Sequence, residues 1–262
     1  MSDPAANLYT QSAEGGAMMA KGKYHRGKEA QSILINFVLD KSGSMDSIRD
    51  ATISGFNEFK NDQAREDGEA FFTLTLFDTE FKTVVSAVPV NDVYDLTRET
   101  YAPSGMTALY DAIAHTMKLT DEFVAKNHPK QVLFVIMTDG HENASREIDR
   151  DQLFAMISDR QGKAGYEFIY LGANQDSFAV GRSIGLRPGR TIDYAASPEA
   201  TRNTMRYVSH NVRAHRRMAE AQSEAFFSPE MDALGGMDAD AYAALSEAER
   251  EAMRERIQSR QG

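Results

Sequence analysis

The sequence predicts an α/β fold: a doubly wound, mostly parallel six-stranded sheet with one antiparallel edge strand and helices on both faces. Short apolar runs alternate with segments in which apolar residues recur every three or four positions. Two of the runs, 33–39 and 132–137, are almost continuously apolar, which is typical of parallel strands buried on both faces. Two further β-rich runs, separated by a short polar turn at 78–80, indicate a hairpin.

The expected strands are separated by helices at regular spacing, which predicts parallel pairing. The strands cover residues 33–39, 71–77, 81–85, 132–137, 166–171 and 191–194. With the hairpin counted as the second and third strands, the usual order of such sheets places the first strand beside the fourth. The hairpin supplies the antiparallel edge strand.

Helical periodicity and end signals predict the helices between these strands. They cover residues 45–59, 107–126, 150–161, 176–184 and 198–222. Gly162 is a plausible C-cap for the third helix. Ser197-Pro198-Glu199 is a helix opening, with a cap residue, a proline at the first helical position and an acid in the first turn. Residues 89–105 are expected to be irregular, with one helical turn near Val93.

Composition divides the chain into three parts. Residues 1–31 are expected to be a flexible arm, residues 32–222 the folded domain, and residues 223–262 an acidic tail with a short terminal helix. No apolar run approaches the roughly 20 residues of a membrane span, and residues 1–29 lack the apolar core of a secretion signal. The absence of cysteine fits a reducing compartment. We therefore expect a cytoplasmic protein without a membrane partner.

The net charge of −10 disfavours nucleic-acid binding, because acidic chains repel phosphate backbones. A local exception is a group of five arginines in the last predicted helix. They are Arg202, Arg206, Arg213, Arg216 and Arg217. Basic runs are common on solvated helix exteriors, and we expect these arginines to form such a face.

Oxygen-bearing side chains follow two of the apolar strands and precede one helix. Asp40, Ser42 and Ser44 come directly after the first strand, and Asp139 follows the fourth. Thr107 lies in a third loop, just before a helix. Ligands of doubly wound sheets bind beyond the carboxyl ends of the strands, where the strand order reverses. We therefore expect these three loops to meet at one edge.

The expected cluster contains two carboxylates and three hydroxyls, which are the donors that hard cations prefer. Mg²⁺ fits best, with Mn²⁺ or Ca²⁺ as alternatives. With only two carboxylates from this chain, the ion would keep a position for an Asp or Glu of a protein partner. The alternative is that each of these residues serves only as a helix cap or turn former.

Five further residues are expected to form a partner-binding rim around this cluster. They are Asp78, Tyr110, His141, Glu142 and Asn143. For Asp78 the alternative is a role in turn chemistry alone. For Tyr110 it is packing, and for the other three it is a solvated loop.

The pattern Asp40-x-Ser42-x-Ser44, a distant Thr107, and then Asp139-Gly140 resembles the metal-ion-dependent adhesion site of von Willebrand factor type A domains. The resemblance covers roughly residues 32–222. It implies that Ser42, Ser44 and Thr107 contact the metal directly or through water, and that the two aspartates act mostly through water. It also implies an intracellular protein of bacterial or phage type.

Three functions remain open at the level of sequence. The first is a non-enzymatic adaptor module that captures an acidic side chain of a partner through Mg²⁺. The second is a Mg²⁺-dependent phosphohydrolase, although Ser42 stands where such enzymes usually place a second aspartate. The third is self-occupation or self-association, in which the tail offers its own carboxylate to the metal. Candidates in the tail are Glu230, Asp232, Asp238 and Asp240.

Overall fold

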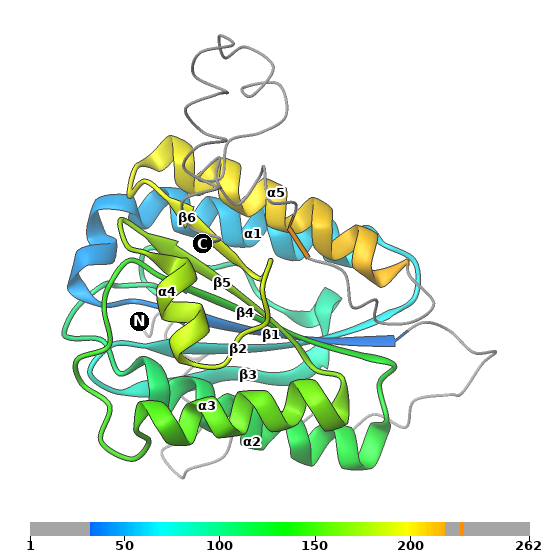
Figure 1. The fold of residues 1–262 in the computed structure, drawn as a ribbon. Helices are drawn as coiled ribbons and strands as arrows, with labels where there is room; N and C mark the ends of the chain where they lie inside the picture. Colours follow the sequence, from blue (N-terminus) through cyan, green and yellow to red (C-terminus); the bar gives the residue numbers. More distant parts are fainter. Residues whose placement is uncertain (1–31, 218–225, 228–262) are drawn as a thin grey trace, which may run out of the picture.

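The computed structural model describes residues 32–217 and 226–227. In this part of the chain a six-stranded sheet lies between two layers of helices, with α1 and α5 on one face and α2, α3 and α4 on the other (Figure 1). The strands are β1 (Ser32–Asp40), β2 (Glu69–Phe77), β3 (Phe81–Pro89), β4 (Gln131–Thr138), β5 (Glu167–Ala173) and β6 (Thr191–Tyr194). The α-helices are α1 (Arg49–Arg65), α2 (Leu109–Asn127), α3 (Arg150–Asp159), α4 (Ser177–Ser183) and α5 (Pro198–Arg216).

The strand order is β3-β2-β1-β4-β5-β6, which confirms the predicted fold class and the predicted pairing of the first strand with the fourth. Only β3 is antiparallel to its neighbour within this sheet. The register pairs Asp40 with Phe77 and Leu39 with Met137. The carboxyl ends of β1, β2 and β4 are therefore level, and the loops that follow them leave the same edge of the sheet.

The sheet is buried on both faces because each helix layer contributes its own apolar core. Toward α1 and α5, Phe37 meets Phe56 and Phe59 edge to face, with ring centroids 5.3 and 5.5 Å apart. Toward α2 and α3, Phe134 stacks on Phe168 at 4.6 Å. All eight residues of β4 are buried, as expected from its continuous apolar run.

Two element ends differ from the sequence-based expectation. The third helix does not end at Gly162: a π-helical turn, Arg160–Ala164, follows α3, and the chain leaves it at Gly165 with a φ of 68°. Gly165 takes the left-handed conformation that favours glycine, so the C-cap assigned to Gly162 was wrong. β3 continues to Pro89 because irregular pairing with β2 and a positive φ at Ala87 let the strand bend.

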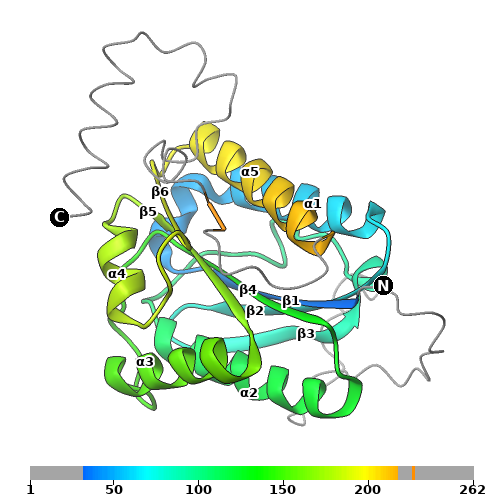
Figure 2. The same ribbon diagram turned by 45° about the vertical axis from the view of Figure 1, so that its right-hand side comes forward.

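Four of the five arginines connect α5 and its C-cap to α1 and its end, although Arg206 and Arg217 remain exposed as the sequence suggested. Arg206 pairs with Glu58, and Arg213 and Arg217 both pair with Glu66. Arg216 is buried and donates to backbone carbonyls at the end of α1 and just beyond it. Figure 2 shows α5 lying along α1. The expectation was wrong for the buried Arg216, because sequence alone did not show which helix lies opposite.

Beyond α5, Phe226 and Phe227 pack against the domain. Phe227 is fully buried, and its ring lies 5.6 Å from that of Tyr207. Its backbone N–H donates to the carbonyl of Gly189 over 3.0 Å. The folded domain thus includes these two residues, beyond the predicted end at 222. The predicted arm, the end of the last predicted helix at 218–222 and the terminal helix lie outside the described residues.

Candidate metal site

The loop after β1 brings its polar side chains together through a tight turn. Asp40 is the last residue of the strand, and Ser42 precedes a 3₁₀ helix, Gly43–Ile48, that contains Ser44. The backbone N–H of Ser42 donates to Oδ1 of Asp40 over 2.6 Å. The hydroxyl oxygens of Ser42 and Ser44 lie 3.2 Å apart. This turn therefore places one carboxylate and two hydroxyls side by side.

The loops before α2 and after β4 complete the cluster. The hydroxyl of Ser44 donates to Oδ1 of Asp139 over 2.6 Å, although the two residues are 95 positions apart. A methyl group at Gly140 would lie 2.9 Å from Oγ1 of Thr107 and 3.8 Å from Oδ2 of Asp40. Glycine thus allows the close approach of Thr107. All five predicted metal ligands meet at one edge of the sheet.

Among the residues that the structure describes, the two carboxylates of the cluster lack a basic partner. Asp40 is fully buried, and burial raises its pKa to about 6, although hydrogen bonds from Thr138 and Ser42 oppose the shift. Burial also raises the pKa of Asp139 above its ordinary value. Neither takes part in an ion pair within the part of the chain that is described. A cation at this position would stabilise both charges.

Lys41 and Asp78 neutralise each other beside the cluster. The Lys41 ammonium pairs with Asp78, whose other carboxylate oxygen accepts the N–H of Glu80 over 2.9 Å. Burial disfavours ionisation of Asp78, but these two donors outweigh it and hold its pKa below the ordinary value. Asp78 was predicted to line the rim; the structure places it at this edge, with its carboxylate already engaged in the turn and the ion pair.

Two predicted rim residues hold the loops of the cluster in place. Oδ1 of Asn143 accepts the N–H of Thr107 over 2.8 Å, and the N–H of Asn143 donates back to the Thr107 carbonyl over 3.0 Å. Glu142 accepts the N–H of Tyr110 over 3.0 Å and the hydroxyl of Ser145 over 2.7 Å. Both side chains thus connect the loop after β4 to the start of α2, which positions Thr107.

The other rim candidates differ in exposure. His141 is exposed and Tyr110 is partly buried. Met106, next to Thr107, is 49% exposed and was missed by the sequence analysis, because a single methionine in a loop carries no periodic signal. On this edge, His141 and Met106 are both exposed.

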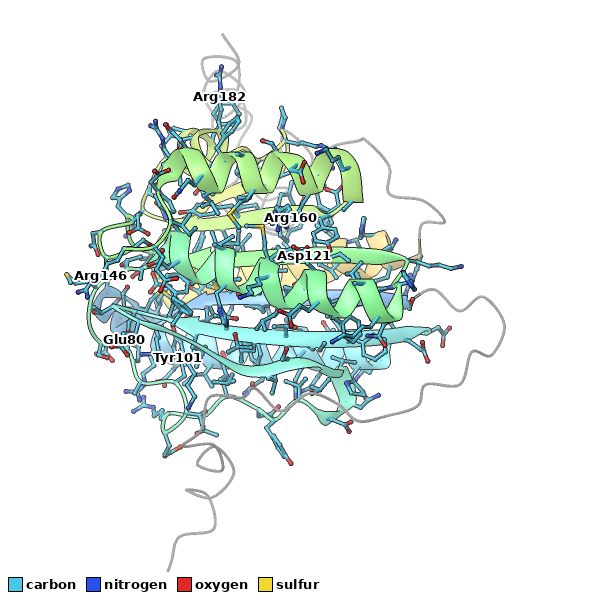
Figure 3. All side chains as sticks on the ribbon, turned by 90° about the horizontal axis from the view of Figure 1, so that it is seen from below. Glu80, Tyr101, Asp121, Arg146, Arg160 and Arg182 are labelled. Atoms are coloured by element: carbon cyan, nitrogen blue, oxygen red, sulfur yellow. The ribbon has the colours of Figure 1, made fainter. Side chains whose placement is uncertain are left out.

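Three residues that support the cluster were also missed. The buried Tyr101 donates its hydroxyl to the carbonyl of Asp40 over 2.5 Å, and Thr138 donates to Oδ2 of Asp40 over 2.5 Å. The carboxylate of Asp111 accepts the backbone N–H groups of residues 146–148. Figure 3 shows Tyr101, Glu80 and Arg146 at the same end of the molecule. The Thr-Asp step at 138–139 was the only sequence signal for this support.

The donor set suits a divalent cation that prefers oxygen ligands. It contains oxygen atoms only, and Ser44 and Asp139 lie at its solvent-accessible side. Among the described residues no three acidic or imidazole side chains converge. An ion at this edge would therefore depend on the hydroxyls of Ser42, Ser44 and Thr107.

Comparison with solved structures identifies similar folds. The von Willebrand factor type A protein from Catenulispora acidiphila matches with 14% identity and a TM-score of 0.50, over 70% of this chain and 42% of that one. The von Willebrand factor domain of the type V pili tip protein Mfa5 from Porphyromonas gingivalis matches with 10% identity and a TM-score of 0.53, over 74% and 99%.

Proximal thread matrix protein 1 from the mussel byssus matches with 16% identity and a TM-score of 0.48, over 70% of this chain and 46% of that one. The chain thus spans less than half the length of two of these three proteins. No protein-family model and no curated protein matches the sequence. At these identities the similarity concerns the fold.

Proposed function

We propose that this chain, which has the fold of von Willebrand factor type A domains, binds one divalent cation at the carboxyl edge of its sheet and uses it to capture a protein partner. The ligands would be Ser42, Ser44 and Thr107, with Asp40 and Asp139 as the balancing carboxylates. Mg²⁺ is the preferred ion, and Mn²⁺ or Ca²⁺ would fit the same donors.

One observation carries the proposal: five oxygen-bearing side chains from three separated loops converge, and the two carboxylates among them have no basic partner among the described residues. The hydrogen bond between Ser44 and Asp139 joins two of these loops. Helix capping explains such residues one at a time, but it does not explain why Asp40 is buried at a pKa of about 6. A bound cation supplies the missing positive charge.

The partner is expected to offer an aspartate or glutamate. The two carboxylates balance the charge of a divalent ion. The bound ion would keep one coordination position for the partner's carboxylate, on the side where Ser44 and Asp139 meet solvent. Around that opening, the exposed Met106 and His141 would contact the partner next to its acidic residue. We expect no nucleic-acid or membrane partner. No helix in the described residues is long and apolar enough to cross a membrane.

The residues around the cluster favour binding over hydrolysis. A hydrolase would need a general acid and a phosphate clamp beside Asp40. Ser42 occupies the position of the acid, and Lys41 is paired with Asp78. A phosphate-ester turnover that disappears in D139A would overturn the adaptor function and support the enzymatic alternative.

Calorimetric titration of the metal-free protein with MgCl₂ tests the metal site first. We expect one binding site in the wild type and in the control S47A, whose hydroxyl lies in the same 3₁₀ helix but outside the cluster. Binding should be lost in D139A and in T107V. Equal Mg²⁺ affinity in all four proteins would refute the proposal.

A second experiment tests partner capture. Immobilised wild-type protein should retain a partner from native lysate in MgCl₂, and release it with chelator or with an excess of free glutamate-rich peptide. D139A should retain nothing under the same conditions. A partner that D139A and wild type retain equally in chelator would show that capture does not use the metal edge.

A further inference from the structure

The layer of α2, α3 and α4 carries a groove away from the metal cluster. It measures ≈ 610 Å³ and lies between α3 and α4. Its lining includes Arg150, Asp151 and Phe154 from α3, and Phe178, Arg182 and Ser183 from α4. Phe154 is 45% exposed, unusual for so large an apolar side chain. The groove thus offers aromatic surface to a ligand.

The charges of the groove favour an acidic ligand. Arg150 pairs with the adjacent Asp151 over 2.9 Å, which leaves Arg182 as the unbalanced charge. Arg182 is exposed, points outward in Figure 3, and makes no ion pair within the part of the chain that is described. A segment with apolar side chains and carboxylates would cover the aromatic surface of the groove and pair with Arg182.

The chain itself contains such a segment. Residues 228–249 include six acidic residues and no lysine or arginine. Within them, residues 237–245 place Asp238 and Asp240 among the apolar side chains of Met237, Tyr242 and Leu245. This composition matches the aromatic surface and the free guanidinium of the groove.

The point at which the tail leaves the domain brings the segment within reach. The N–H of Phe227 is bonded to the carbonyl of Gly189, and Gly189 follows Arg182 by seven residues. Seven residues span at most ~25 Å when fully extended. Met237 follows Phe227 by ten residues, which can span ~35 Å. The tether is therefore long enough, and a local concentration of about 1 mM lets weak contacts suffice.

We propose that residues 237–245 dock in the α3–α4 groove of the same chain. Met237, Tyr242 and Leu245 cover Phe154 and Phe178, and an aspartate of the segment pairs with Arg182. The tail then acts as an internal ligand that covers this face. The proposal does not depend on the metal, because no residue of the groove belongs to the metal cluster.

The protein contains no tryptophan, so a single F154W substitution in the full-length chain reports on the groove alone. Acrylamide quenching of its fluorescence measures how far the tail covers this position. We compare F154W with F154W carrying D238K and D240K, with F154W carrying R182E, and with F154W carrying R182E and D240K together. The control is F154W with R202E, which reverses an arginine on α5, across the sheet from the groove.

We expect the quenching constant to rise about twofold in the D238K/D240K and R182E proteins, because like charges then face each other across the groove. Combining R182E with D240K should restore the protection of the F154W fluorescence from acrylamide, and R202E should leave this protection unchanged. Protection should also be independent of protein concentration, because the ligand is tethered.

Three results would overturn the proposal. Equal quenching in all these proteins would show that the segment does not cover Phe154. Protection that disappears on dilution would show that the ligand belongs to a second copy of the chain. Protection that requires Mg²⁺ and is lost in D139A would place the tail at the metal cluster, whereas a failure of metal binding alone would leave the groove result unaffected.

Discussion

Replacing Asp40 by asparagine removes a buried negative charge while keeping the size of the side chain. Asparagine can still accept the Ser42 N–H through its carbonyl oxygen, and the Thr138 hydroxyl can turn to accept from the new amide while donating to the Gly140 carbonyl. The main change is therefore electrostatic. In the metal-free protein, this change should stabilise the fold.

The magnitude follows from the pKa of Asp40, which burial raises from 3.8 to about 6. The folded protein holds the Asp40 proton more tightly than the unfolded chain does. The ionisation of Asp40 therefore does not lower the free energy of unfolding below pH 3.8. Stability is then lost as the pH rises to about 6, and the loss stays constant above it. One pKa unit corresponds to about 1.4 kcal/mol, so the cost at pH 7 is about 3 kcal/mol.

Urea unfolding of wild type and D40N in chelator, from pH 4 to pH 7.5, measures this cost. At pH 7 we expect D40N to be more stable by about 3 kcal/mol, and at pH 4 by less than about 1 kcal/mol. Comparing the two proteins cancels the pH dependence of groups that do not interact with Asp40, whereas Asp139, whose charge contributes to the raised pKa of Asp40, is coupled to it. With MgCl₂ at 100 times the dissociation constant, only the wild type should gain about 2.7 kcal/mol.

Two outcomes would refute this reasoning. If D40N and wild type were equally stable at pH 7 in chelator, the charge of Asp40 would already be balanced and would not require a cation. If the difference did not shrink toward pH 4, its cause would be packing and not ionisation.

Three further variants test the supports of the site and of the fold. Y101F removes the hydroxyl that donates to the Asp40 carbonyl, and it should cost about 1–2 kcal/mol in urea unfolding, with Mg²⁺ affinity nearly unchanged. G140A would place a methyl group 2.9 Å from the Thr107 hydroxyl. Calorimetry should then show that the Mg²⁺ affinity is about tenfold weaker. An unchanged affinity would mean that Thr107 is not a ligand. E167Q leaves the buried Arg190 without its counter-charge and should lower the free energy of unfolding by about 3–5 kcal/mol. A loss below about 1 kcal/mol would show that water reaches this pair.

Much of the candidate site could be predicted because its residues follow signals that are local in the chain. An apolar run that ends in Asp40-x-Ser42-x-Ser44, and another that ends in Thr138-Asp139, mark the carboxyl ends of strands. A general rule of α/β topology then places those ends at one edge. The rim was harder to predict, because its roles depend on contacts across the fold. Glu142 and Asn143, for example, bond to the start of α2.

The sequence by itself determined the strands, the helices and the residues that could hold a cation, because burial and backbone preference repeat at short periods along the chain. Tertiary structure alone decided which charges meet. It paired Lys41 with Asp78 and the arginines of α5 with Glu58 and Glu66, and it left Arg182 exposed beside Phe154. Electrostatic pairing depends on distances between residues far apart in sequence, and those distances exist only once the chain has folded.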